Sequence, residues 1–152
     1  MQRKLMTLVV IHQHPRVLLG MKKRGFGAGK WNGFGGKVLE GETIHQAAQR
    51  ELAEECGLTA TDLDERGTLD FRFTDKPDEV LEVHFFRTTA FTGQPTESEE
   101  MEPRWFHLDE IPFDRMWTDD PLWMPLFFAG KKFTGSFLFD GDRIIEHTLQ
   151  TV

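Results

Sequence analysis

The sequence is poor in cysteine, tyrosine, long apolar runs and net positive charge. Its 152 residues include one cysteine, Cys56, and no tyrosine. A lone cysteine cannot form an internal disulfide, so we expect a cytoplasmic protein and leave any mitochondrial or nuclear share open. No apolar run approaches the roughly 20 residues that cross a bilayer, so we expect no membrane association. The net charge of −7 argues against a DNA or RNA polymer as a ligand.

What remains is typical of a compact domain. The chain is 39% hydrophobic and 28% charged, and its length suits a single domain spanning residues 1–152. Alternating patterns predict strands at 4–11, 16–23, 67–73, 80–91 and 104–108, and a hairpin of 133–139 with 143–151 that turns at Asp140-Gly141. Helices are predicted at 43–56 and 119–128. Mostly antiparallel strands with two helices indicate an α+β fold in layers.

The first predicted helix has clear boundary signals. Thr43 suits the N-cap, and Gln46 three residues later completes a capping box. Gly57 suits the C-terminal stop, because glycine tolerates the left-handed conformation found there. On a helical wheel the apolar stripe of this helix is formed by Ile44, Ala48 and Leu52.

Three carboxylates of this helix, Glu51, Glu54 and Glu55, fall on or beside the apolar stripe. An unpaired carboxylate at the edge of a core is costly, and like charges four residues apart repel. A divalent cation would offset both costs. Because Mg²⁺ prefers oxygen ligands and is commonly shared with substrate phosphates, the pattern predicts a metal site that acts on a phosphate compound.

A basic, glycine-rich segment precedes the helix. Residues 24–36 contain six glycines, and Gly35-Gly36 permit close backbone approach. Five cations lie between residues 22 and 37, with no acidic residue among them: Lys22, Lys23, Arg24, Lys30 and Lys37. The segment lacks the P-loop pattern but has the character of a nucleotide-phosphate site. A flexible hairpin connection is the simpler alternative.

The order of these residues resembles the Nudix box without departure, over residues 36–58. The matching positions are Gly36, Glu42, Arg50-Glu51-Leu52, Glu54-Glu55 and Gly57-Leu58. The resemblance implies a mixed β-sheet sandwiched between helices, and Mg²⁺-dependent hydrolysis of a nucleoside diphosphate derivative, with Mn²⁺ as a substitute. It implies that the metal is held by Glu51, Glu54, Glu55, Glu100 and the Gly35 carbonyl. Arg50 would hold a box glutamate, Glu42 would orient the loop, and Glu55 or an outside carboxylate would take the proton of the attacking water.

Beyond the box, the resemblance narrows to the branch of the Nudix family that acts on oxidised purine nucleotides. The segments that carry it are Gly20–Lys37, Ile111–Phe113, Met116-Trp117, Asp119-Asp120 and 132–149. It implies a monomer that hydrolyses 8-oxo-dGTP, and 2-hydroxy-dATP as well, to the monophosphate and pyrophosphate. Leu81 departs from the branch, whose mammalian members carry methionine there, and residues 74–80 are longer by one.

The same resemblance implies a base pocket. Trp117 would stack on the purine, and Phe26, Phe71 and Phe73 would close its other sides. Asp119 and Asp120 would accept hydrogen bonds from the base, and Asn32 would contact its opposite edge. The remaining substrate contacts expected are Thr7, Lys22, Phe34, Gly35, Gly36, Lys37, Leu81 and Thr118. Without the resemblance, Phe71 and Phe73 could equally be core residues, and Asp119 and Asp120 could equally be the N-cap of a helix.

Two aspartates this close in an apolar pocket repel, so one should hold a proton. Sharing that proton would let the pocket accept both oxidised guanine and oxidised adenine. Two other functions stay open: a Nudix hydrolase of dinucleoside polyphosphates, ADP-ribose or capped RNA, and a non-catalytic nucleotide-binding module. The other acids of the 97–102 loop, Glu97, Glu99 and Glu102, read as solvated surface. No role is expected for Cys56 or for the six histidines.

Overall fold

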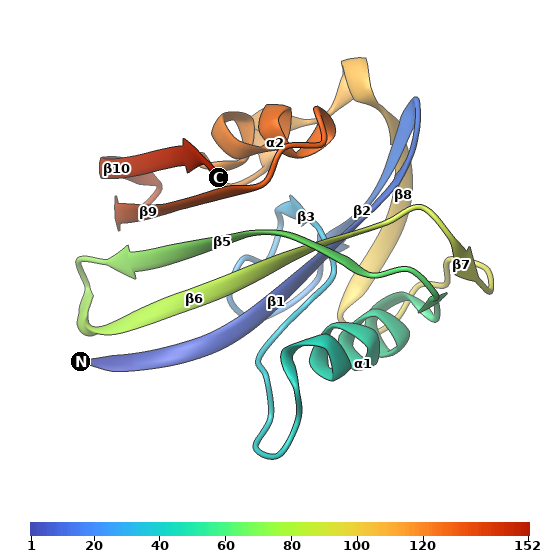
Figure 1. Cartoon of the computed structure of the whole chain (residues 1–152), viewed down its shortest axis with the longest axis horizontal. Coiled ribbons are helices and arrows are strands. Elements are labelled where there is room, and N and C mark those ends of the chain that lie inside the picture. Colours follow the sequence, from blue (N-terminus) through green and yellow to red (C-terminus); the bar gives the residue numbers. More distant parts are fainter.

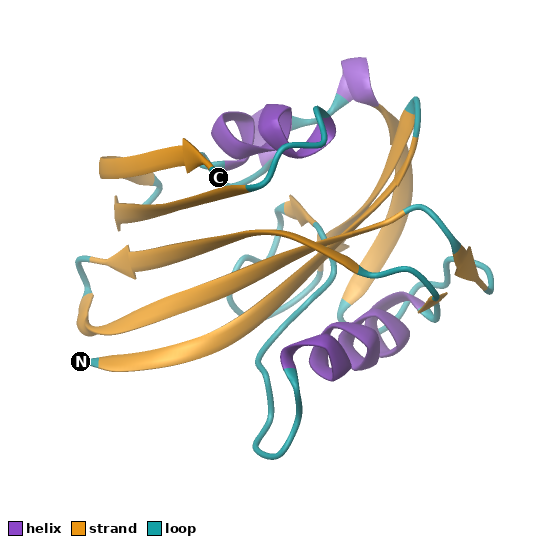
Figure 2. Cartoon of the chain, in the orientation of Figure 1, coloured by secondary structure: helices purple, strands orange, loops and turns teal.

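The computed structural model describes all residues 1–152 as a twisted sheet flanked by helices (Figures 1 and 2). The helices are α1 (Ile44–Cys56) and α2 (Asp120–Phe128), with short 3₁₀ turns at Leu108–Glu110 and Phe113–Arg115. The strands are β1 (Gln2–Gln13), β2 (Arg16–Lys22), β3 (Trp31–Asn32), β4 (Thr59–Ala60), β5 (Asp64–Phe73), β6 (Lys76–Thr88), β7 (Phe91–Thr92), β8 (Met101–His107), β9 (Phe133–Asp140) and β10 (Arg143–Thr151). No helix is long and apolar enough to cross a membrane.

The main sheet has eight strands. Seven follow the order β10-β9-β5-β6-β1-β2-β3, and β8 also pairs with β2. β1 pairs with β6 and β5 with β9 in parallel, while the other pairs are antiparallel. The expected mixed sheet between helices is therefore confirmed. β4 and β7 form a separate two-stranded sheet beside α1.

The two faces of the sheet carry two apolar clusters, because successive residues of a strand point to opposite faces. On β1, Val9 and Ile11 join the cluster that includes Leu52 and Cys56 of α1, whereas Val10 joins the cluster that includes Trp123 of α2. Figure 1 shows the two helices on opposite sides of the strands. Cys56 is 0% exposed, its Sγ donates to the Leu52 carbonyl, and burial raises the pKa of its thiol to about 12.

The boundaries predicted from local signals agree with the structure at α1 and at the last hairpin. The Thr43 hydroxyl accepts from the Gln46 amide at 3.0 Å, and the Gln46 side chain accepts from the Thr43 amide at 3.0 Å. Gly57 is left-handed with φ 74°, and so is Gly141 with φ 62° at the β9–β10 turn. These signals act within a few residues, so they do not depend on the tertiary fold.

The predicted strand at 80–91 is wrong at its end. β6 stops at Thr88, and Phe91 belongs to β7, which pairs with β4. The Asp62 carboxylate is the cause, because it accepts hydrogen bonds from the hydroxyls of Thr88 and Thr89 and from the Ala90 amide. This carboxylate, distant in sequence, turns the chain out of the sheet.

A segment of the glycine-rich region runs antiparallel to β1. The Val9 and Phe34 backbones exchange hydrogen bonds of 2.6 and 2.9 Å, and the Thr7 amide donates to the Gly36 carbonyl at 2.9 Å. The two chains are so close that a Cβ on Gly35 would lie 1.8 Å from the Thr7 carbonyl oxygen. Only glycine fits there, and its fit lets the segment pair directly with β1.

Candidate active site

A cavity of about 270 Å³ opens on the α2 side of the sheet. This volume lies just below the range of about 300–1,000 Å³ for drug-sized ligands, so it suits a single heterocyclic base. Twelve of the expected substrate contacts line it: Thr7, Lys22, Phe26, Asn32, Gly35, Gly36, Phe71, Phe73, Leu81, Trp117, Asp119 and Asp120. Residues far apart in sequence thus meet around one space.

The walls of the cavity are aromatic. The Trp117 ring lies 5.1 Å from Phe26, tilted by 35°, and edge-on to Phe73 and Phe139 at 6.2 and 5.9 Å. Phe26 is 64% exposed at the mouth and contacts Phe73 at 5.6 Å. Flat walls of this kind favour a planar ligand.

Two buried carboxylates form the polar part of the cavity. Asp119 and Asp120 are 4% and 2% exposed, and both accept a hydrogen bond from the Trp123 indole N–H, at 2.9 and 3.1 Å. Neither caps α2 through its side chain, and Asp120 Oδ2 is buried without a partner. A buried unpartnered oxygen beside a cavity is a vacant acceptor for a ligand donor.

Burial also changes how this pair titrates. Loss of solvent raises the pKa of Asp119 to about 6. Loss of solvent and the neighbouring Asp119 charge raise the pKa of Asp120 well above its ordinary value. The pair therefore holds a proton to higher pH than two ordinary aspartates would, and while it holds one it offers a donor as well as acceptors.

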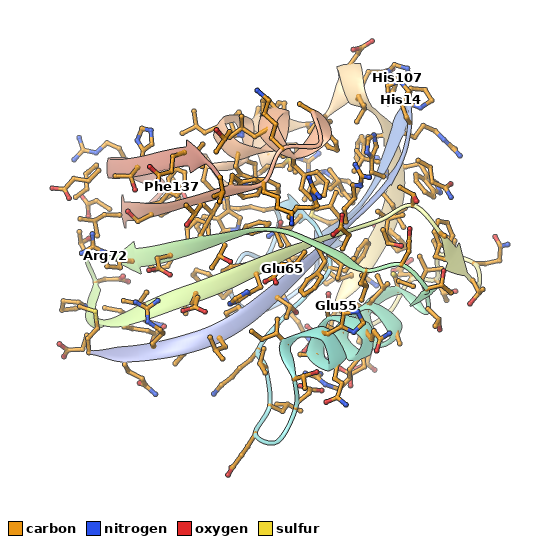
Figure 3. The ribbon with its side chains drawn as sticks, viewed as in Figure 1. His14, Glu55, Glu65, Arg72, His107 and Phe137 are labelled. Atoms are coloured by element: carbon orange, nitrogen blue, oxygen red, sulfur yellow. The ribbon has the colours of Figure 1, made fainter.

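A third buried carboxylate, Glu55, borders the cavity from the opposite direction. It projects from α1 toward the sheet (Figure 3) and is 4% exposed. Its Oε1 accepts a hydrogen bond from the Gly35 amide at 2.8 Å. Burial, with a smaller contribution from the Glu51 charge, raises the pKa of Glu55 to about 8 despite that bond.

Arg50 connects the remaining carboxylates of this region. It forms a two-point contact with Glu42 through Nε at 2.7 Å and Nη2 at 3.1 Å, and donates to Glu51 at 2.9 Å and Glu54 at 3.2 Å. Glu42 in turn accepts from the Leu39 amide at 2.9 Å. These contacts raise the pKa of Arg50 and lower that of Glu42.

The wheel prediction is wrong for one of the three helix carboxylates. The Glu51 side chain is 15% exposed, but that of Glu54 is 59% exposed, because the sheet covers only part of this helix face. The three carboxylates do not converge on one point, since Glu51 and Glu54 turn to Arg50 and Glu55 to Gly35.

The donor set nevertheless suits a divalent cation. It comprises two partly or fully buried carboxylates, an exposed one, and the Gly35 carbonyl, which accepts no hydrogen bond in the structure. A Cβ on Gly36 would lie 2.7 Å from the Glu51 carboxylate, so glycine keeps this approach open. Oxygen donors are the ligands that hard divalent cations prefer.

Besides Arg50, Glu51 and Glu54, four expected site residues lie outside the cavity. Phe34 is 0% exposed in the α1-side cluster, and Lys37 is exposed to solvent. The Thr118 hydroxyl donates to the Asp142 carbonyl at 2.9 Å. The Glu100 carboxylate pairs with Arg24 at 2.7 Å and Lys22 at 3.3 Å, which lowers its pKa.

Several lining residues were not expected from the sequence. They are Met6, Leu8, Gly27, Gly33, Val83, Phe85, Met101 and Phe139. Val83 and Phe85 could have been found, because they share a strand face with Leu81. Met101 had no comparable signal, because its place depends on the pairing of β8 with β2.

The comparisons with known proteins agree with this geometry. The NUDIX domain family model matches residues 2–127. An "Oxidized purine nucleoside triphosphate hydrolase" from Danio rerio is 57% identical over 98% of this chain and 96% of its own length, and one from Mus musculus is 55% identical over the same shares. The crystal structure of a MutT protein from Bacillus halodurans superposes with a TM-score of 0.84, at 24% identity over 96% of this chain and 97% of that one. Since the matched region contains both the Arg50–Glu55 helix and most of the cavity, the chain belongs to the Nudix family.

Proposed function

We propose that this chain hydrolyses oxidised purine nucleoside triphosphates, 8-oxo-dGTP among them, to the monophosphate and pyrophosphate. Such a reaction removes damaged purines from the nucleotide pool before they enter DNA. One observation carries the proposal: a base-sized aromatic cavity has a vacant buried acceptor at Asp120, beside Asp119, and meets the carboxylate helix at Glu55. The names of the two animal relatives support the same substrate class.

The base would lie against Trp117, with its N–H groups toward Asp119 and Asp120. Guanine offers such donors at N1 and N2. Asn32 already accepts from the Gly33 amide through Oδ1 at 2.8 Å, so its NH₂ group is left to donate to the opposite edge of the base. The pocket can thus hold a purine from two edges and one face.

The triphosphate would extend toward Gly35, Gly36 and Lys22, which line the cavity on the side of α1. A divalent cation, for which we propose Mg²⁺ with Mn²⁺ as a substitute, would be held by Glu51, Glu54, Glu55 and the Gly35 carbonyl. When bound, such an ion polarises phosphoryl oxygens and lowers the pKa of water. Glu55 would accept the proton of the attacking water at Oε2, because Oε1 is engaged by the Gly35 amide. A role for Glu100 at the same ion would require it to leave Arg24.

A substrate panel tests this function. We expect pyrophosphate release from 8-oxo-dGTP with a kcat/KM well above that for dGTP, and little turnover of ADP-ribose or dinucleoside polyphosphates. Cleavage of ADP-ribose yields two monophosphates and no pyrophosphate, so the nucleoside monophosphate product must be measured as well as pyrophosphate. A preference for ADP-ribose or for a dinucleoside polyphosphate would contradict the proposal and favour another Nudix activity.

The shared proton of Asp119 and Asp120 predicts a change in base preference. Replacing either residue by Asn fixes one donor and removes the charge, so the ratio of kcat/KM for 8-oxo-dGTP to that for 2-hydroxy-dATP should change roughly tenfold or more, the worth of a lost charged hydrogen bond. Asp109→Asn, at an exposed side chain outside the cavity, serves as the control. If both pocket variants keep the parental ratio, proton sharing does not set the breadth of the pocket.

A monomer acting on free nucleotides in the cytoplasm stays a prediction. The net charge of −7 supports the exclusion of DNA and RNA polymers, because such ligands require extended basic surface.

A further inference from the structure

Lys30 contacts the base-stacking tryptophan from outside the cavity. Its Nζ lies 5.3 Å from the centre of the Trp117 ring, within the range of a cation–π interaction. Trp117, Phe26 and Gly27 line the cavity, but Lys30 does not. The ammonium group thus lies over one face of the ring without itself lining the cavity, which leaves the other face for a base.

The backbone of Lys30 is fixed in the sheet region. Its carbonyl accepts from the Lys22 amide at 3.1 Å, and its amide donates to the Gly27 carbonyl at 3.1 Å. Lys30 directly precedes β3, whereas the left-handed glycines Gly25, Gly27 and Gly29 lie on its other side. The backbone from which the ammonium group projects is thus anchored at the end of the glycine-rich loop that joins the sheet.

The β9–β10 turn joins the same corner. The Asp142 carboxylate lies 3.7 Å from Lys30 Nζ, and the Asp142 carbonyl accepts from the Thr118 hydroxyl at 2.9 Å. The Asp142 side chain is 77% exposed, so the ion pair itself adds little stability. Its effect is to fix positions, because Asp142 contacts both Lys30 and Thr118, the residue next to Trp117.

We propose that Lys30 is a positioning residue for Trp117, and that its ammonium group strengthens the stacking of Trp117 on the purine base. The inference rests on the proposed function. A cation over one face of an aromatic ring draws π-electron density toward itself. The opposite face then stacks more strongly on an electron-rich ring, and the extra oxygen of an oxidised purine enriches the ring in electrons. Together with the Phe26, Phe73 and Phe139 rings that border the indole, Lys30 also restricts its tilt.

The test compares three variants without requiring turnover. Lys30→Met keeps the length of the side chain and removes the charge, whereas Lys30→Arg keeps a cation. Lys131→Met removes an exposed lysine that does not line the cavity, as a control for net charge. Binding of 8-oxo-deoxyguanosine, which has no phosphate, is measured by calorimetry. We expect binding to weaken roughly two- to fivefold in Lys30→Met, and to match the parent in Lys30→Arg and Lys131→Met.

Kinetics on 8-oxo-dGTP give a second measurement. KM should rise by a similar factor in Lys30→Met while kcat changes little, since base stacking is equal in the ground and transition states. Unchanged nucleoside binding in Lys30→Met, or a loss seen only when phosphates are present, would overturn the proposal, the latter by showing that Lys30 contacts phosphate. A parent protein that binds no oxidised nucleoside would instead contradict the proposed function.

Discussion

Replacing Glu55 by Gln is expected to lower kcat for 8-oxo-dGTP by roughly 10²–10⁴-fold, the range for loss of a general base. The change removes the charge and the proton acceptor but keeps the shape, and the Gln oxygen can still accept from the Gly35 amide. Binding of 8-oxo-dGMP should be retained, because the proposed position of the base is against Trp117 and the two aspartates. Glu99→Gln, at an 88% exposed side chain, is the matched control. Unchanged turnover in Glu55→Gln would contradict its assignment as the base.

The same substitution should stabilise the metal-free protein at high pH. The pKa of Glu55 is raised to about 8 in the folded state, above the ordinary value of 4.5, so folding favours the protonated form. Its contribution to stability is therefore present below pH 4.5 and is lost as the pH rises toward 8. In chelator at pH 8, Glu55→Gln should melt roughly 5–10 °C above the parent, and the difference should shrink by pH 5. A variant that melts below the parent at pH 8 would show that Glu55 is stabilised as an anion.

Gly35→Ala is expected to cost roughly 3 kcal/mol or more of the free energy of unfolding. The added Cβ would lie 1.8 Å from the Thr7 carbonyl oxygen and 2.5 Å from its carbon, both backbone atoms of β1 that cannot turn aside. Urea unfolding measures the loss. The control is Gly130→Ala, where the added Cβ would meet no atom. Only the left-handed backbone conformation disfavours alanine there, at a cost of roughly 1–2 kcal/mol.

Gly35→Ala should lower activity as well as stability, and the loss of activity should remain under conditions where the variant is fully folded. The Gly35 amide holds Glu55, so a shift of this segment away from β1 moves the proposed base. Equal unfolding free energies for Gly35→Ala and Gly130→Ala would mean that β1 yields more readily than its hydrogen bonds with residues 34–38 indicate.

Local signals carried much of the fold prediction. The capping box at Thr43 and Gln46, the left-handed Gly57 and the turn at Gly141 depend on neighbours in sequence, and the structure confirms each. The strands β3, β4 and β7 are only two residues long, too short to show the alternation of apolar and polar residues that predicts a strand. The end of β6 depends on Asp62, more than twenty residues away, so no local pattern could place it.

The sequence predicts which types of residue form the candidate site better than it predicts the direction in which each side chain points. Strand alternation groups Leu81 with Val83 and Phe85, but only the fold shows that Phe34 packs under α1. A helical wheel places Glu54 beside Glu51 and Glu55 and cannot show where the sheet ends. The Trp123 indole, which holds both Asp119 and Asp120, was not expected, although its spacing of three and four residues would place it on their side of a helix.

The position of Cys56 has a consequence for survival under oxidative stress. Peroxides attack the thiolate form of cysteine, and they attack it where it is exposed. The only thiol of this chain is enclosed beneath α1 and remains protonated at any physiological pH. Hydrogen peroxide therefore finds no thiolate in this chain from which a sulfenic acid would readily form.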